Sequence, residues 1–385
     1  MSITTSELIQ RARDLAPILA QHASEAERER KPADTVIEAM REARIFDLMV
    51  PRIYGGLEFD LDTYLEVGLA LSEGDASMAW VATFYIEHNW MLCQFPEAFQ
   101  RELYADCSHV LAPASLAPDG YAEPVEGGLR LSGRWKWATG WPHAEWVIAG
   151  AQLARDKGRP ELLFFALPRD QVDFEDTWWV DGMRATGSHD ILIDERVVPP
   201  ERTVSIPAMS EGKAPGAQIH EGPLYRTPMS PILGLAASMP AVGQARAGLA
   251  RFKEELGARD VYGGSKKHAE RPAAQIRLAG LELAVEQAEQ LLRQVVGEVM
   301  KVRERASPGQ RTRWLAATAT AVQQSRQILA TIAQGSGASA HFESHPLQRA
   351  VRDVNTLSCH TVFDLDQRLE NYGRTLLGLE PNSLY

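Results

Sequence analysis

Two stretches of the chain carry its most informative pattern: residues 131–146 read LSGRWKWATGWPHAEW, and residues 183–200 read MRATGSHDILIDERVVPP. In the first stretch, Trp135, Trp137 and Thr139 stand at alternate positions, which predicts a β-strand with all three side chains on one side. Two aromatic rings and a hydroxyl on one face would form a platform for a flat ligand that makes hydrogen bonds. The second stretch predicts a turn at TGS, followed by the strand ILI.

The composition limits the kinds of partner that the chain can have. Its 385 residues carry a formal net charge of −11, which argues against nucleic acid or an anionic membrane as a partner, because both attract basic surfaces. Cys93, Cys107 and Cys359 show no CxxC spacing, and a small, odd number of cysteines fits a reducing cytoplasm. The N-terminus lacks the apolar core of a signal peptide, and the most apolar stretch, residues 78–86, is too short to span a membrane. We therefore expect a cytoplasmic protein.

The first part of the chain, residues 1–113, is predicted to be helical. A capping box fits residues 4–7, and apolar residues follow it at helical spacing. Three further helices are predicted to open at Pro32, to span residues 62–73 and to span residues 77–95. These segments together form the first predicted domain.

The pattern changes after Pro113 and again near residue 228. Short β-type runs separated by Gly, Pro and Asp fill residues 114–227 and predict a small antiparallel barrel or sandwich, which ends in a loop or linker over residues 208–228. Residues 228–385 hold four long amphipathic segments, typical of a four-helix bundle: 231–256, 271–305, 309–335 and 345–377. We therefore predict three domains in a mainly α fold with a central β-domain.

The motifs SGxWxxxTG and TGSxDIxIxxxxVP, in the two stretches quoted first, resemble the β-domain of the acyl-CoA dehydrogenase superfamily, which binds a flavin. More narrowly, they are similar to the oxygenase components of two-component flavin-dependent monooxygenases. That branch includes steroid-phenol hydroxylases, p-hydroxyphenylacetate hydroxylases and dibenzothiophene monooxygenases. The order of helical domain, β-domain and helical bundle is also the order of the acyl-CoA dehydrogenase fold, so the resemblance covers nearly the whole chain.

The resemblance implies a set of flavin contacts. Thr139 matches a Ser or Thr that hydrogen-bonds the flavin near N5 and C4=O, and Trp137 would lie against the ring system. Arg259 matches a basic residue that reaches the flavin phosphate, often from a neighbouring subunit, and a guanidinium suits phosphate geometry. FMN and FAD both stay open, because no adenine-specific motif is visible. The implied flavin-binding set is Trp137, Thr139, Trp179, Ser188, Arg259 and Ser115. Ser115 lies in residues 114–120, ASLAPDG, which are predicted to form a loop.

Two histidines resemble the substrate-facing histidines of the phenol-hydroxylating relatives. His88 lies in HNWxLxxF, at the polar interruption of an otherwise apolar helix, where a buried imidazole needs a partner or a function. His360 ends the motif HPLQRxxRDxxxxxxH. Each histidine alone could be structural, but two independent matches favour functional roles. One of them would be the general base and the other would orient substrate or peroxide, and the sequence leaves open which is which.

Four aromatic side chains near these motifs are candidate walls for a flat substrate, with core packing as the alternative for each: Phe84, Tyr85, Trp90 and Trp141. The sequence HFESH at residues 341–345 has histidines but not a recognised zinc spacing, so we predict no metal site. His341 is read as a loop residue, and His345 with Pro346 as the first turn of the final helix.

The resemblance also implies a reaction and its partners. Reduced flavin, FMNH2 or FADH2, would react with O2 and form a C4a-hydroperoxide. The distal oxygen of this hydroperoxide would then be transferred to an aromatic or heteroaromatic molecule. Thr139 would hold the flavin N5–H, and a histidine with a pKa near the working pH would take the proton of a phenol. No GxGxxG motif follows a strand and no P-loop is present, so reduced flavin should come from a separate NAD(P)H:flavin reductase. A homo-oligomer, expected to be a tetramer, would form through the C-terminal bundle.

Three other functions compete with this one. An acyl-CoA dehydrogenase or oxidase uses a Glu, which one large group places in the C-terminal loop, and residues 352–366 offer His and Asp but no Glu. An N-oxygenase of the same fold would act on amino sugars, whereas the paired histidines favour an aromatic substrate. A non-enzymatic helical assembly protein would bind no flavin. Trp141 and Pro142 replace residues that many of the oxygenases share, which bears on the substrate more than on the reaction.

Overall fold

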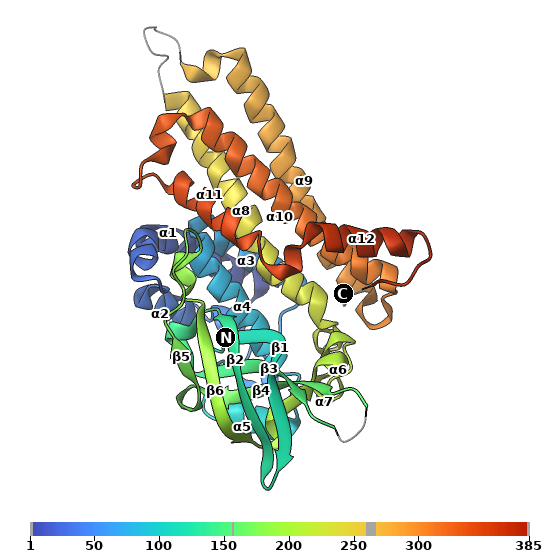
Figure 1. Cartoon of the computed structure of the whole chain (residues 1–385). Coiled ribbons are helices and arrows are strands. Elements are labelled where there is room, and N and C mark those ends of the chain that lie inside the picture. The colour runs from blue at the N-terminus through green and yellow to red at the C-terminus, as the bar shows by residue number, and fades with distance from the viewer. Residues whose placement is uncertain (1–2, 156–157, 259–266, 383–385) are drawn as a thin grey trace.

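The computed structural model describes residues 3–155, 158–258 and 267–382, and five α-helices come first in this part of the chain (Figure 1). They are α1 (Thr5–Glu29), α2 (Asp34–Glu42), α3 (Leu61–Gly74), α4 (Ala76–Leu92) and α5 (Glu97–Leu103). Thr4 and Glu7 form the predicted capping box before α1. Helix α5 was not predicted, and α2 begins at Asp34 rather than at Pro32. Every residue of α4 is buried, because α3, α8 and the turn before β6 pack around it.

A sheet follows, with its seven described strands in the order β5-β6-β2-β1-β3-β4-β7. The strands are β1 (Ala114–Val125), β2 (Gly128–Ala138), β3 (Trp146–Leu153), β4 (Glu161–Pro168), β5 (Asp173–Glu175), β6 (His189–Val198) and β7 (Thr203–Ser205). β1 and β3 pair in parallel, so the prediction of an antiparallel sheet was wrong for this pair. The other pairs run antiparallel, as predicted.

The strand β1 contains a segment that the sequence analysis took for a loop. Pro118, Asp119 and Gly120 are poor strand formers, and they hide the strand pattern. In the structure the register of β1 against β3 shifts between Ser115 and Gly120, so an irregularity in the pairing absorbs these residues. The loop assignment of Ser115 was therefore wrong.

Helices form the remainder of the described chain. Two short helices, α6 (Ile206–Ser210) and α7 (Gly216–Ile219), lie in the region predicted as a loop or linker. Three long helices follow as predicted: α8 (Met229–Ala258), α9 (Pro272–Val302) and α10 (Pro308–Ser336). The fourth predicted helix is broken into α11 (Pro346–Leu357) and α12 (Leu365–Leu376), with a 3-10 turn at Thr361–Phe363 between them. The prediction of one continuous helix was wrong at this break, which carries His360.

The layers meet at one place, where α4 passes between the sheet and the bundle (Figure 1). One apolar core fills the N-terminal helices with parts of α8, α9 and α10, a second fills the bundle, and a third lies within the sheet. Trp80 and Phe84 of α4 belong to the bundle core. No described helix is both long and apolar enough to cross a membrane. The described residues also hold no group of three or more His, Cys, Asp or Glu arranged for a metal ion.

Candidate active site

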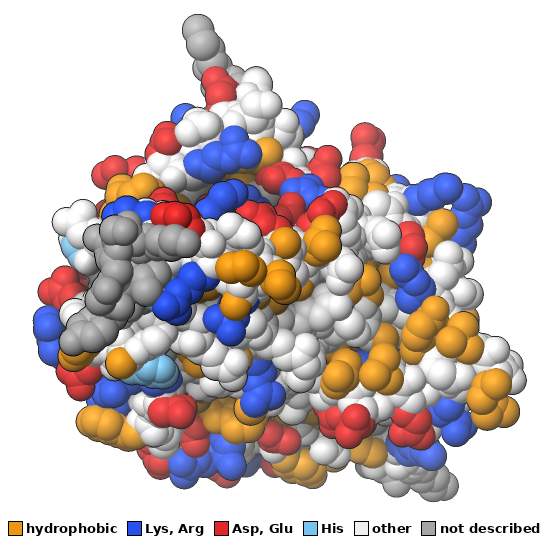
Figure 2. All heavy atoms as spheres, turned by 90° about the horizontal axis from the view of Figure 1, so that it is seen from above, with side chains coloured by type: hydrophobic (Ala, Val, Ile, Leu, Met, Phe, Trp, Pro, Cys, Tyr) orange, Lys and Arg blue, Asp and Glu red, His pale blue; other side chains and the backbone are white. Residues whose placement is uncertain are grey.

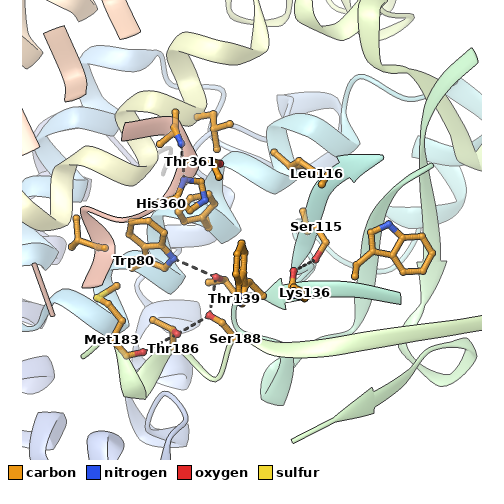
Figure 3. Close-up of a pocket in the computed structure, with 18 of the residues that line it drawn as sticks. Trp80, Ser115, Leu116, Lys136, Thr139, Met183, Thr186, Ser188, His360 and Thr361 are labelled. Atoms are coloured by element: carbon orange, nitrogen blue, oxygen red, sulfur yellow. Dashed lines mark hydrogen bonds between the residues drawn. The ribbon is translucent and has the colours of Figure 1, made fainter. Parts of the chain in front are cut away.

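A cavity of about 690 Å³ opens where α4, the sheet and the break between α11 and α12 meet (Figure 3). The break brings His360 against α4, with its ring 5.6 Å from that of Trp80 and 6.4 Å from that of Phe84. Because a continuous helix would carry residue 360 along the bundle axis, the interruption is what places this imidazole in the cavity wall. His345 caps α11 and Pro346 is its first residue, as the sequence predicted.

One face of α4 forms the aromatic wall of the cavity. Trp80, Phe84 and His88 follow one another at a spacing of four residues, which keeps them on the same side of a helix. Each ring contacts the next one along the helix. The ring centroids are 4.7 Å apart for Trp80 and Phe84 and 5.5 Å apart for Phe84 and His88. Tyr85 and Trp90 lie on other faces and are buried in the helical core, where they donate to the carbonyls of Gly140 and Leu224. Neither residue lines the cavity, so the cavity does not support their assignment as substrate walls.

The predicted platform on β2 is only partly present. The pairing of β2 with β6 shifts between Trp135 and Ala138, and Trp137 has a φ of 65°, so the alternation of faces stops there. Trp135 is fully buried in the sheet core and donates to the carbonyl of Gly150, while the Trp137 side chain is 57% exposed. The predicted alternation of faces therefore stops at Trp137, although Trp135, Trp137 and Thr139 all line the cavity.

Trp141, a further candidate wall, lies elsewhere. Its ring is buried in the sheet core, with the Arg169 guanidinium carbon 3.6 Å from the ring centroid. It does not line the cavity, so the cavity does not support its assignment as a substrate wall either. The positive φ of Gly140, 81°, turns the chain immediately before this tryptophan and directs it away.

A chain of hydrogen bonds crosses the floor of the cavity (Figure 3). Nε1 of Trp80 lies 3.3 Å from the Thr139 hydroxyl, which lies 3.0 Å from the hydroxyl of Ser188. Ser188 continues to the Thr186 hydroxyl at 2.7 Å, and Thr186 donates to the Met183 carbonyl at 2.9 Å. Thr139 and Ser188, which were predicted as separate flavin contacts, therefore belong to one hydrogen-bond network.

The two ends of this hydroxyl chain set its direction. An indole N–H can only donate and a carbonyl can only accept, so protons point from Trp80 towards Met183 through Thr139, Ser188 and Thr186. Thr139 then donates its hydroxyl proton to Ser188 and accepts the N–H of Trp80 with one of its lone pairs. A hydroxyl oxygen has two lone pairs, so Thr139 has one left for a donor on a ligand in the cavity.

The turn that carries Ser188 is anchored to the bundle. Asp353 of α11 accepts a hydrogen bond from the Met183 backbone N–H at 2.6 Å, and Trp178 donates to the Met183 carbonyl at 2.9 Å. Trp178 lines the cavity. Trp179, which was expected to contact flavin, is outside the lining, 68% exposed, with the Arg30 guanidinium carbon 3.4 Å from its ring centroid. Of the neighbouring pair Trp178 and Trp179, only Trp178 lines the cavity.

Asp353 makes the stability of this region dependent on pH. Burial first, and the neighbouring Asp75 carboxylate second, raise the pKa of Asp353 to about 7. A carboxyl whose pKa is higher in the folded than in the unfolded state stabilises the fold when protonated, and this contribution is lost as the pH rises through about 7. We expect Asp353→Asn to flatten the fall of unfolding free energy between about pH 4 and 7, by up to ~1.4 kcal/mol per pH unit. Urea unfolding of both proteins at several pH values measures this difference. Equal slopes of unfolding free energy against pH would contradict the prediction.

Two other expected flavin contacts have different outcomes. Ser115 lines the cavity and donates its hydroxyl proton to the Lys136 carbonyl at 3.0 Å, which leaves its oxygen as an acceptor. Arg259 lies outside the described residues.

The two histidines carry their protons on different ring nitrogens. Nδ1 of His88 lies 2.6 Å from the Ala112 carbonyl, which only accepts, so Nδ1 holds the proton and Nε2 has the lone pair. Nδ1 of His360 accepts from the Val362 N–H at 3.2 Å, so in the neutral ring Nε2 holds the proton. Burial lowers the pKa of both histidines to about 4, with a further contribution from the Arg368 charge at His360. Neither has the pKa near the working pH that the sequence analysis expected of the base.

Comparison with known proteins identifies the family. Residues 4–105 match the model for the N-terminal domain of acyl-CoA dehydrogenase, and residues 235–365 match that for its C-terminal domain. The chain is 33% identical to a pigment production hydroxylase of a Rhodococcus strain over 98% of both chains. It is 30% identical to the oxygenase component of an FADH2-dependent resorcinol hydroxylase of a Rhizobium strain, over 98% of this chain and 96% of that one. The chain belongs to the oxygenase components of flavin-dependent monooxygenases. It is an oxidoreductase that uses reduced flavin.

The solved structures agree with this assignment. The 3-HSA hydroxylase from Rhodococcus sp. RHA1 superposes with a TM-score of 0.93, with 28% sequence identity and coverage of 98% of each chain. The monooxygenase therefore has the acyl-CoA dehydrogenase-like fold that the resemblance implied.

Three residues of this monooxygenase that line the site or anchor it were not predicted from the sequence: Trp80, Thr186 and Asp353. The spacing of Trp80, four residues before Phe84 and eight before His88, was the available signal for the first of them. Thr186 belongs to the TGS turn that had been singled out, but only the fold shows that its hydroxyl continues the chain from Ser188. Asp353 lies in the motif that ends at His360, and no local pattern indicates its contact with Met183.

Proposed function

We propose that this monooxygenase hydroxylates a phenolic aromatic or heteroaromatic molecule, bound between the wall of Trp80 and Phe84 and a reduced flavin that the Thr139 hydroxyl holds. The observation that carries the proposal is the cavity itself. One wall offers aromatic rings for a flat substrate, and the floor offers a hydroxyl with a free lone pair. Resorcinol hydroxylase, a relative by sequence, bears the name of such a substrate.

Reduced flavin fits the floor of the cavity. Its N5–H is a donor, and the direction of the hydroxyl chain leaves Thr139 with an acceptor lone pair for it. Trp137 is exposed at the cavity and would cover the ring system, while the oxygens of Ser115 and Ser188 would meet polar groups of the flavin. When bound and reduced, the flavin supplies O2 activation and delivers an electrophilic oxygen atom. FMN and FAD both fit these contacts.

The two histidines are assigned different roles because their protons lie on different ring nitrogens. Nε2 of His88 has the lone pair, so we assign to His88 the acceptance of the proton from the substrate's hydroxyl group. Nε2–H of His360 is a donor, and we assign to it the orientation of the substrate or of the oxygen being transferred. A phenol becomes a better nucleophile as its proton leaves, so both roles favour attack by the ring carbon. The apolar rings around the cavity would keep water from the reacting atoms.

Two partners complete the proposal. A separate NAD(P)H:flavin reductase in the same cytoplasmic compartment would supply the reduced flavin. A homotetramer would form through the bundle, where Ile276 and Leu283 lie seven residues apart on α9 and are both strongly exposed. Figure 2 shows apolar side chains among charged ones on the face seen from above. Burial of such side chains against other copies would stabilise the assembly.

The test is a product analysis with purified protein, an NADH-driven flavin reductase and a panel of phenols, indoles and thiophenes. The proposal expects a phenol to gain one hydroxyl group whose oxygen comes from ¹⁸O2, detected by mass spectrometry. Catalase and superoxide dismutase in the assay exclude hydroxylation by free peroxide or superoxide. Product without ¹⁸O, or oxidation of sulfur or nitrogen substrates alone, would contradict the proposal.

A further inference from the structure

Asp353 on α11 is a buried carboxyl group for which the proposed function has no role. Only 2% of its surface is exposed, and burial of such a group costs free energy. Its Oδ1 accepts the backbone N–H of Met183 at 2.6 Å, and its Oδ2 lies 3.4 Å from the hydroxyl of Ser77 on α4. One side chain thus connects the bundle, the helix of the aromatic wall and the turn that carries Ser188.

The turn lies so close to α11 that only glycine fits at its base. A Cβ atom on Gly182 would overlap with the backbone carbonyl oxygen of Arg352 and the hydroxyl oxygen of Thr356, both on α11. The next residue, Met183, has a φ of 58°, a left-handed conformation that is uncommon for a residue with a side chain. Such a conformation persists only where surrounding contacts hold it. The contacts with α11 therefore fix the backbone of Met183.

The backbone of Met183 is also where the hydroxyl chain of the cavity floor ends. Its carbonyl accepts the hydroxyl of Thr186 and the indole N–H of Trp178, both at 2.9 Å. Without this acceptor, the Thr186 proton could turn to Ser188, and Ser188 could donate to Thr139. Thr139 would then accept from both of its neighbours in the chain and direct its own proton, rather than a lone pair, into the cavity.

We propose that Asp353 is a positioning residue of the flavin site, which keeps the Thr139 hydroxyl an acceptor for the flavin N5–H. It acts through Met183: the carboxyl group fixes the backbone N–H, and the carbonyl of the same residue then directs the hydroxyl protons away from the cavity. The inference rests on the proposed function and adds a residue that does not line the cavity. The position of the Asp353 oxygen, and not its charge, decides this effect.

The first test compares side chains at position 353 by the fraction of consumed O2 that appears in hydroxylated phenol. Asp353→Ala removes the acceptor, and we expect this fraction to fall about tenfold, because misplacement of a positioned group can lower a rate by up to about 10²-fold. Asp353→Asn keeps an oxygen at the same reach and should stay within about twofold of the wild type. Asp353→Glu keeps the carboxyl group but moves its oxygens, so it should lose coupling as Asp353→Ala does.

The matched control is Asn355→Ala on the same helix. The Asn355 side chain accepts from Arg326 on α10 at 2.8 Å, away from the turn. This variant removes a contact of α11 without changing the support of Met183, so it should keep the coupling of the wild type.

A double-mutant cycle with Thr139→Val separates a role in the hydroxyl chain from a general loss of structure. Without the Thr139 hydroxyl the chain has no acceptor to orient, so Asp353→Ala should lower the coupling of the Thr139→Val protein by less than about twofold. A general defect would lower it by the same factor in both backgrounds. If Asp353→Ala does not fold, Gly182→Ala takes its place. Its methyl group displaces the turn from α11 with Asp353 unchanged, so it should give the same loss and the same dependence on Thr139.

A further measurement needs neither flavin nor substrate. The indole N–H of Trp80 donates to Thr139, so its NMR resonance in protein with ¹⁵N-labelled tryptophan reports on the order of the hydroxyl chain. A hydroxyl that donates onwards is a stronger acceptor than one that does not. We therefore expect the resonance to shift upfield and its hydrogen exchange to become faster in Asp353→Ala, but not in Asp353→Asn or Asn355→Ala. Trp80→Phe assigns the resonance.

The outcomes separate this inference from the proposed function. If the wild type hydroxylates phenols and Asp353→Ala is equally well coupled, the positioning role is wrong and the proposed function stands. The same conclusion follows if Asp353→Asn loses as much as Asp353→Ala, or if the loss is independent of Thr139. If the wild type hydroxylates no phenol, the proposed function fails, while the Trp80 resonance still reports whether Asp353 orders the hydroxyl chain. An unchanged Trp80 resonance in Asp353→Ala would also overturn the inference.

Discussion

Thr139→Val should turn the protein from an oxygenase into a producer of hydrogen peroxide. Valine has nearly the shape of threonine but cannot accept a hydrogen bond from the flavin N5–H, and it leaves Ser188 and Trp80 without their partner. Loss of one preorganised hydrogen bond at a reacting group lowers rates on the order of 10²-fold or more. We expect a drop of about 10- to 100-fold in the fraction of consumed O2 that appears in hydroxylated product, with the remainder released as peroxide.

The matched control for this variant is Thr139→Ser, which keeps the hydroxyl and hence the direction of the hydroxyl chain. It should stay within about threefold of the wild type in coupling of O2 to product, since only a methyl group is lost. Oxygen uptake, peroxide release and product yield, measured together, give the coupling for each protein. A Val variant as well coupled as the Ser variant would show that the Thr139 hydroxyl does not hold the reduced flavin.

His88→Gln should leave flavin binding intact and abolish most of the hydroxylation. Glutamine fills much of the same space and can still donate to the Ala112 carbonyl, but it cannot take a proton from a phenol. General-base catalysis contributes on the order of 10²- to 10⁴-fold, so we expect kcat to fall by about that factor while KM changes little. Stopped-flow rates of product formation at saturating phenol, beside flavin titrations, separate the two effects.

Substrate acidity provides the control for this second variant. Fluorinated phenols ionise at lower pH and need the base less, so the loss caused by His88→Gln should shrink as the phenol becomes more acidic. His360→Gln removes an N–H donor rather than a base, so its loss should not depend on substrate acidity. If both variants respond equally to phenol acidity, the division of roles between the histidines is wrong.

The sequence predicted the fold well where periodicity is strong. The helix capped by Thr4, the long helices of the bundle and most strands lie where apolar spacing placed them. It failed where tertiary contacts override local preference. Pro118 and Gly120 lie within β1 because β2 and β3 supply the hydrogen bonds of this strand. The last predicted helix breaks at His360 although its apolar spacing continues.

The site could be predicted residue by residue, but not as a geometry. The resemblance indicated Thr139, Ser188, His88 and His360, and all four line one cavity. Tyr85 and Trp90 were chosen because they stand near His88 in the sequence, whereas a turn of 3.6 residues sends them to other faces. The anchoring of the Met183 turn by Asp353 joins residues 170 positions apart, and such a contact has no local signature.

The most direct test of the central claim is the fate of bound reduced flavin after oxygen is added. Anaerobic protein is mixed with reduced FMN or FADH2 in a stopped-flow instrument, then with O2, and the flavin spectrum is followed with and without a phenol. We expect oxidised flavin to form much more slowly on the protein than it does from free reduced flavin. When a phenol is present, we expect it to be hydroxylated during this delay. Return of oxidised flavin at the free-flavin rate with both cofactors would contradict it.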